Sequence, residues 1–96
     1  MTPRWRMLFA PSVVTVVRAL PPDVKRSVRE ALEAISIDPR LGKELLRELH
    51  GLRSYRARRY RIVYELVVAM RQVHVVAVGH RSTVYEELAR RRIAGR

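Results

Sequence analysis

The sequence predicts an α+β fold in which a helical hairpin and a C-terminal helix pack on a small, mainly antiparallel four-stranded sheet. Three observations support this prediction. Apolar residues recur at helical spacing between residues 12 and 37. Apolar stretches separated by short breaks then run from residue 52 to residue 80, as expected for antiparallel strands that follow one another. Residues 82–93 carry glutamates near the start and arginines near the end, where both suit a helix dipole.

The first strand and the first helix are the weakest of these elements. Residues 4–10 alternate well enough to form a strand that ends at Pro11. Ser12 can cap a short helix that extends to about Leu20. Because this helix is rich in β-branched valine, its helix propensity is low. Whether it forms must therefore depend on tertiary packing.

A second and stronger helix follows. The segment Pro21-Pro22-Asp23 interrupts the pattern and starts a helix over residues 23–37, which Asp38-Pro39 ends. Leucines between Arg40 and Gly51 predict one or two further helical turns before the strands begin.

The C-terminal half predicts three consecutive strands, which complete the sheet. With two or three helices packed on one face, the other face would be left to solvent or to a ligand. These strands are expected at residues 52–58, 60–69 and 72–80.

Composition limits the classes of function. A chain of 96 residues is expected to form a single domain, residues 1–96, with one modest core. It has no cysteine, and its three histidines, His50, His74 and His80, lack the spacing of metal ligands. We therefore expect no metal and no small-molecule cofactor. No apolar run approaches the roughly 20 residues that span a bilayer, and the N-terminus makes a poor signal peptide, so we expect a cytoplasmic protein without a membrane partner.

The net charge of +11 favours an anionic partner. Residues 1–48 carry nine cationic and six anionic side chains, whereas residues 49–96 carry eleven cations, all arginine, and three anions. This asymmetry indicates a nucleic acid or an acidic protein, although a basic face kept for solubility is the alternative.

One stretch, Tyr55–Tyr64, concentrates the charge. It holds four arginines and three tyrosines in ten residues and continues into an apolar strand. Each guanidinium must stay in water or against an anion, so the stretch predicts a sheet edge that holds phosphate.

Three segments of the chain resemble the RelE/ParE superfamily of toxins from toxin–antitoxin pairs. They are "LPPDVKRSVREALEAISIDPRLG", "LHGLRSYRARRYRIVYEL" and "VHVVAVGHRSTVY", and the last two are the more specific. The resemblance implies the RelE-like version of the fold described above. RelE-like members cleave messenger RNA in the ribosomal A site, whereas ParE-like members inhibit DNA gyrase without cutting it, and both share one fold.

The resemblance places Arg61 and Arg81 where RelE-like toxins carry arginines that clamp the scissile phosphate. Metal-free RNA cleavage needs attack by the 2′-OH, a base, an acid for the 5′-oxygen, and positive charge on the phosphorane. The alternative is that each arginine is an exposed residue paired with Glu65 or Glu86.

Two further family positions fall on Tyr85 and Arg56. Tyr85 would stack on a base or transfer a proton, or else pack on the sheet as a core residue. RelE-like proteins often carry two basic residues near Arg56. Aligned without a gap, the second position is Ser54, whereas a gapped alignment makes the pair Arg56 and Arg58.

His80 is the candidate for the general base, because imidazole titrates near neutrality and arginine does not. A histidine bonded to the backbone at a strand end is the alternative. Arg53, Arg58 and Arg59 are expected to attract RNA. Family members commonly have a glycine near Arg58, so here either the turn is wider or one arginine is strained.

Three functions follow from the resemblance. The first is a ribosome-dependent endoribonuclease acting on mRNA, the second a non-catalytic gyrase inhibitor, and the third a degenerate toxin that only binds its antitoxin. All three imply a cognate antitoxin, and the charge of +11 predicts that its wrapping segment is acidic.

Overall fold

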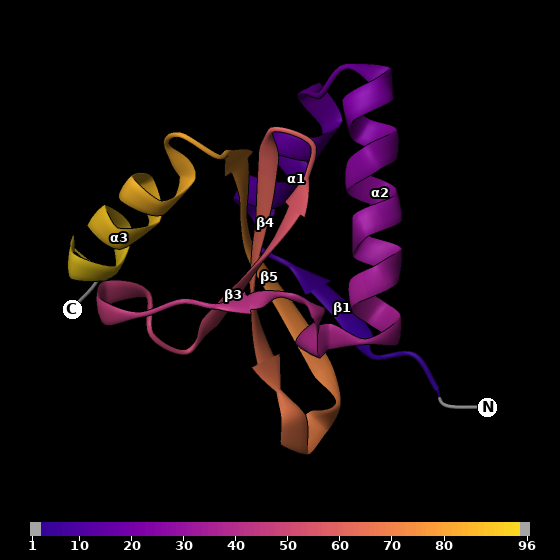
Figure 1. Ribbon diagram of the computed structural model, residues 1–96, viewed down its shortest axis with the longest axis vertical. Coiled ribbons are helices and arrows are strands. Elements are labelled where there is room, and N and C mark those ends of the chain that lie inside the picture. Colours follow the sequence, from indigo (N-terminus) through magenta and orange to yellow (C-terminus); the bar gives the residue numbers. More distant parts are fainter. Residues whose placement is uncertain (1–2, 95–96) are drawn as a thin grey trace.

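The computed structural model describes residues 3–94, with side chains up to Arg92. Within these residues the strands form a central sheet with helices on both of its sides (Figure 1). In chain order they are β1 Arg6–Phe9, α1 Pro11–Ala19, α2 Pro22–Ile37, β2 Lys43–Glu44, β3 Leu52–Ala57, β4 Tyr60–Val67, β5 Gln72–His80 and α3 Val84–Ala94. Short 3₁₀ helices lie at η1 Pro39–Leu41, η2 Arg47–Leu49 and η3 Val68–Met70.

The strands form one mixed sheet in the order β1-β5-β4-β3-β2. β1 runs parallel to β5, and the other neighbouring pairs are antiparallel. The predicted α+β fold is confirmed, with five strands where four were expected. The additional strand, β2, contains only Lys43 and Glu44, which lie opposite Ser54 and Arg53 of β3.

The segment between Arg40 and Gly51 is only partly as predicted. Instead of α-helical turns it forms β2 between the 3₁₀ helices η1 and η2. So few residues are a poor nucleus for an α-helix, and their backbone groups find partners elsewhere. The N–H of Leu45, for example, donates to the carbonyl of Leu52 at 2.9 Å.

Helices α1 and α2 cover one face of the sheet, which we call the α1/α2 face. α1 begins at Pro11 with Ala10 as the N-cap, two residues before the expected cap at Ser12. Proline is favoured there because the first helical N–H has no partner within the helix. The buried core on this face comprises Trp5, Val13, Leu20, Val28, Ala31, Ile35, Ala57, Ile62, Tyr64, Val73, Val75 and Val78.

The opposite face was expected to be open, and this expectation is wrong. Helix α3 and η2 cover part of it, and Figure 1 shows α3 and α2 on opposite sides of the strands. We call this side the α3 face. Val84 and Leu88 of α3 are buried there because the sheet offers an apolar surface to them. This second core comprises Leu49, Leu52, Val63, Ala77, Val84 and Leu88.

Tyr64 fixes the connection between α2 and β2. Its buried hydroxyl donates to the carbonyl of Pro39 at 2.6 Å and accepts from the N–H of Gly42 at 2.9 Å. Burial raises the pKa of this hydroxyl above the usual 10.0. Gly42 is required because a Cβ atom there would lie 2.2 Å from the Tyr64 oxygen.

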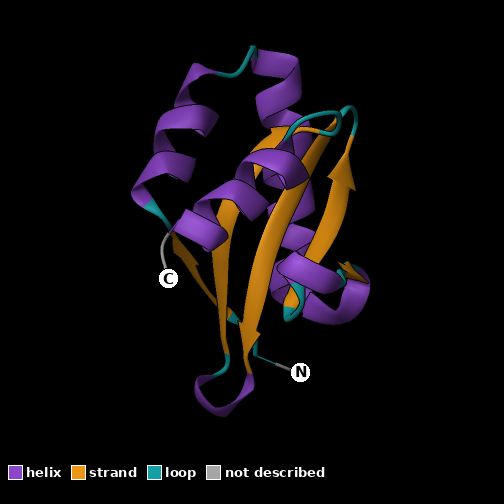
Figure 2. Ribbon diagram, turned by 90° about the vertical axis from the view of Figure 1, so that its left-hand side faces the viewer, coloured by secondary structure: helices purple, strands orange, loops and turns teal. Residues whose placement is uncertain are grey.

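The β4–β5 hairpin extends beyond the helices at the bottom of Figures 1 and 2. In its turn, the guanidinium of Arg71 lies 4.8 Å from the centre of the Trp5 ring, a cation–π contact that ties the hairpin to the N-terminal segment. None of the helices within residues 3–94 is long and apolar enough to cross a membrane.

Candidate functional site

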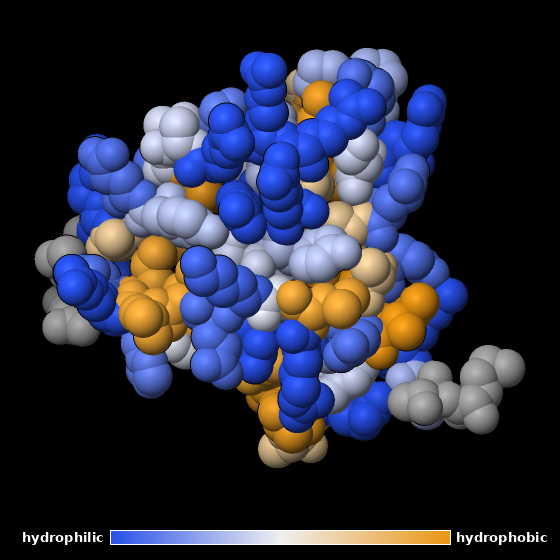
Figure 3. Space-filling view, viewed as in Figure 1, coloured by the Kyte–Doolittle hydropathy of each residue, from blue (hydrophilic) through white to orange (hydrophobic). Residues whose placement is uncertain are grey.

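Most of the predicted site residues lie where the β3–β4 turn meets the end of β5. Tyr60 and His80 are partners across β4 and β5, and the N–H of Arg81 donates to the carbonyl of Arg59 at 2.8 Å. The turn and the β5–α3 loop are therefore held side by side. Figure 3 shows hydrophilic side chains over this upper end of the molecule.

The β3–β4 turn is tight and has a strained arginine. Pairing continues up to the two turn residues, Arg58 and Arg59. Arg58 has φ 57°, in the left-handed region that usually selects glycine. Of the two outcomes expected for the missing family glycine, the strained arginine is the one that forms. The Nε of Arg56 donates to the carbonyl of Arg58 at 3.1 Å, and the guanidinium of Arg58 pairs with Asp23 at 3.0 Å.

Arg56 and Arg61 lie directly opposite each other on β3 and β4. They share the α3 face with Ser54 and Val63, because side chains two positions apart on a strand point the same way. Arg61 is half-buried and Arg56 is exposed. Two like charges in direct opposition repel each other, and a bound anion would relieve that repulsion.

Among the described residues, no carboxylate forms an ion pair with Arg56, Arg61 or Arg81. The alternative in which Glu65 or Glu86 neutralises them is therefore not what the structure shows. Glu86 instead pairs within α3, with Arg90, at 3.7 Å.

Gly79 brings α3 close to this site. It is the β5 partner of Arg61, and a Cβ atom there would meet the Val84 side chain at 3.1 Å. The missing side chain lets the first turn of α3 rest on the sheet. This glycine was not singled out from the sequence, although a glycine inside a strand is a recognised sign of close approach.

Tyr85 lies against the second core with its ring partly buried. Its hydroxyl donates a 2.7 Å hydrogen bond to the Oγ of Ser54, which is almost fully buried. Ser54, the second position in the gapless alignment, shares a face with Arg56, but its hydroxyl is occupied inside the protein. Tyr85 combines a packing role with a position next to the arginine pair.

The arginines expected to attract RNA divide into two groups. Arg53 points to the other side of the sheet from Arg56, where its guanidinium bonds the Gly42 carbonyl at 2.8 Å and Glu44 at 2.9 Å. It holds the β2 segment in place. Arg58 is paired with Asp23, and the side chain of Arg59 is exposed.

His80 is at the same end of the molecule but on the α1/α2 face. Its ring meets that of Tyr60 edge-on, with 5.9 Å between centroids. Its Nδ1 lies 2.7 Å from the Oγ of Ser82 and accepts the N–H of the same residue at 3.2 Å. Ser82, expected to start the last helix, instead orients this ring, and α3 begins at Val84.

Of the other two histidines, His74 contacts a neighbouring side chain of β5, whereas the bond between His50 and α3 uses the backbone carbonyl of His50. Nε2 of His74 lies 2.9 Å from Oε1 of Gln72, and the carbonyl of His50 accepts a hydrogen bond from Arg92 in α3. Among the described residues, no three histidine or acidic side chains cluster as metal ligands would.

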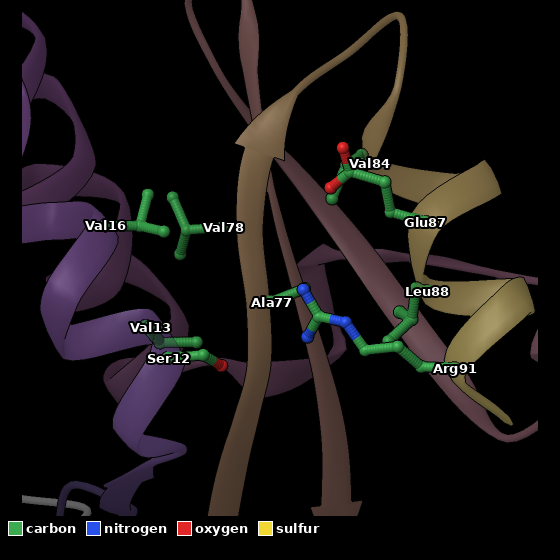
Figure 4. A pocket seen from close by; sticks show the side chains of 9 residues that line it. All are labelled: Ser12, Val13, Val16, Ala77, Val78, Val84, Glu87, Leu88 and Arg91. Carbon is green, nitrogen blue, oxygen red and sulfur yellow. The ribbon is translucent and has the colours of Figure 1, made fainter. Parts of the chain in front are cut away.

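A small hollow lies between α1, β5 and α3. Figure 4 shows Val16 and Val78 pointing toward each other and Arg91 reaching from α3 toward β5. Its volume is about 60 Å³, room for one or two water molecules. No arginine of the predicted site lines it; Arg56 and Arg81 are exposed at the surface instead.

Comparisons with known proteins identify the class. The family "ParE toxin of type II toxin-antitoxin system, parDE" matches residues 13–85. The chain therefore belongs to the ParE toxin family and is a toxin of a toxin–antitoxin system. The comparison with curated proteins gives no match.

Solved structures agree with this assignment. The chain is 31% identical to a chain of the RelBE2 toxin–antitoxin complex of Mycobacterium tuberculosis, with a TM-score of 0.74, covering 85% of this chain and 97% of that one. It is 26% identical to the isolated RelE toxin of E. coli, with a TM-score of 0.70 and coverage of 91% and 97%. A YoeB/ParE toxin of Agrobacterium tumefaciens, 13% identical with a TM-score of 0.69 and coverage of 78% and 96%, shares the fold.

Proposed function

We propose that this toxin is a ribosome-dependent mRNA endoribonuclease that inhibits translation. The observation that carries the proposal is the opposed pair Arg56 and Arg61, which has no carboxylate partner among the described residues. Arg81 adds a third cation from the adjoining loop. A cluster of this kind suits the dianionic phosphorane formed during RNA cleavage.

The reaction requires no metal. The 2′-oxygen attacks the adjacent phosphorus and loses its proton, the bond from phosphorus to the 5′-oxygen breaks, and that oxygen gains a proton. The products are a 2′,3′-cyclic phosphate and a 5′-hydroxyl. Arg61 and Arg81 stabilise the phosphorane, Arg56 assists them, and the ring of Tyr85 supports a base beside them.

A second function, inhibition of DNA gyrase, is favoured by the family match, which is to ParE toxins. The site is compatible with it, because an arginine surface can also bind an acidic protein segment. Both functions involve a cognate antitoxin, which we expect to contact this surface through an acidic wrapping segment.

The deciding experiment compares wild type, Arg61→Ala and Arg81→Ala in a translation extract with defined codons in the A site. Arg29→Ala is the matched control, because Arg29 is an exposed arginine of α2. Codon-specific cleavage by wild type and the control, with a loss of about 10²-fold or more in the two site variants, is expected from removing transition-state charge.

A parallel assay with purified gyrase separates the alternatives. Intact mRNA together with blocked supercoiling would overturn the nuclease proposal in favour of the gyrase target. If neither assay responds while the antitoxin still binds, the chain is a degenerate toxin.

A further inference from the structure

The hydrogen bonds of His80 determine which of its ring nitrogens carries the proton. A backbone N–H can only donate, and the N–H of Ser82 points at Nδ1 from 3.2 Å. The Nδ1 atom must therefore present its lone pair. The Ser82 hydroxyl, 2.7 Å away, can donate to the same atom. In the neutral ring the proton then lies on Nε2.

The orientation of the ring is also fixed. Tyr60 stands edge-on to it at an interplanar angle of 72°. The residue is exposed, and Nε2 has no hydrogen-bond partner among the described residues. His80 thus presents one N–H donor to the surface at the end of the sheet.

This arrangement is poorly suited to a general base. The Nε2 atom already carries a proton and has no lone pair with which to accept another. Moving that proton to Nδ1 would place it against the N–H of Ser82 and break a hydrogen bond. Arg61 lies opposite Gly79 on the neighbouring strand, and Gly79 directly precedes His80. The side chains of Arg61 and His80 therefore project from opposite faces of the sheet.

We propose that His80 is a hydrogen-bond donor that binds, through Nε2, a phosphate oxygen of the RNA next to the scissile one, and that Ser82 is the positioning residue that sets its tautomer. This inference rests on the proposed function for its ligand. Its chemical basis, the fixed tautomer, does not depend on that function.

The tautomer is tested by long-range ¹H–¹⁵N correlation spectra of the labelled protein, at a pH alkaline enough for a neutral ring. His80 is assigned by the loss of its signals in His80→Gln. A protonated Nε2 and an unprotonated Nδ1 are expected. A protonated Nδ1, or rapid exchange between the two forms, would overturn the proposal whether or not the protein cleaves RNA.

The ligand is tested with a short single-stranded RNA carrying a 2′-deoxy substitution at the cleavage site. Its addition is expected to shift the Nε2 resonance of His80 while Nδ1 remains unprotonated. An unchanged Nε2 resonance under conditions where Arg61 signals shift would contradict the phosphate contact.

Kinetics of the variants distinguish donor from base. His80→Gln keeps an N–H donor at a similar reach, so cleavage should fall by no more than about threefold, against about tenfold for His80→Ala, as expected for one hydrogen bond. A general base would instead lose about 10²–10⁴-fold in both variants. Equal, large losses with an intact fold would refute the donor role.

Discussion

The hydroxyl of Tyr85 donates a 2.7 Å hydrogen bond to the Oγ of Ser54 and so ties the first turn of α3 to β3. Tyr85→Phe removes this donor and leaves the Ser54 oxygen buried without it. We expect the free energy of unfolding to fall by about 1 kcal/mol, the usual contribution of such a bond. Urea unfolding of the two proteins provides the measurement.

A double-mutant cycle isolates this bond from other effects of the substitution. Ser54→Ala alone should cost a similar amount, and the double variant should cost less than the two single changes together. If the stability loss of the double variant equals the sum of the two single losses, the bond contributes nothing to stability.

Tyr64 gives the protein a specific sensitivity to alkaline pH. Burial raises the pKa of its hydroxyl above 10.0, so the unfolded chain releases this proton before the folded protein does. The stabilisation is fully present below pH 10 and is lost as the pH rises from there through the folded-state pKa. Unfolding curves recorded at successive pH values should show this decline.

Tyr64→Phe is the control for that measurement. It lacks the titrating group, so its stability should fall less steeply above pH 10, although it is less stable at neutral pH because Pro39 and Gly42 lose their partner. Parallel pH profiles for both proteins would contradict the assignment to Tyr64.

The strained turn at Arg58 predicts a stabilising substitution. Arg58→Gly relieves a left-handed conformation, worth about 1 kcal/mol, but loses the exposed ion pair with Asp23. Arg58→Ala loses the same ion pair and keeps the strain. The glycine variant should therefore unfold at a higher temperature than the alanine variant. The reverse order of unfolding temperatures would show that the turn is not strained.

The opposed pair Arg56 and Arg61 should make stability depend on salt. Raising the ionic strength screens their repulsion, so wild type should gain more stability than Arg56→Gln, by a few tenths of a kcal/mol. Arg29→Gln, which removes an arginine of α2, should keep the wild-type response. Identical salt dependence in all three proteins would rule out the repulsion.

Much of the fold could be predicted from sequence because its signals are local. The apolar residues of α2 recur at helical spacing, and β3, β4 and β5 lie within two residues of the predicted ranges at each end. The choice of Arg61 and Arg81 rests instead on the resemblance of two segments to RelE/ParE toxins, and it stays a prediction. Helix starts were less certain, because Ser12 and Ser82 are good caps in isolation but neither serves as one here.

The features that were missed depend on contacts between distant segments. Whether α3 packs beside α2 or on the other face depends on the path of the loop after His80, which residue types alone do not specify. Arg53 likewise resembles the other arginines of its strand, and only the position of Glu44 and Gly42 shows that it holds the chain together.

The central place of β5 bears on how the chain folds during synthesis. β1, at one edge of the sheet, finds its sheet partner in β5 alone, and both cores use side chains of β5. The first seventy residues therefore cannot close either core by themselves. Because proteins are made from the N-terminus, the arginine surface can assemble only when the last quarter of the chain has emerged from the ribosome.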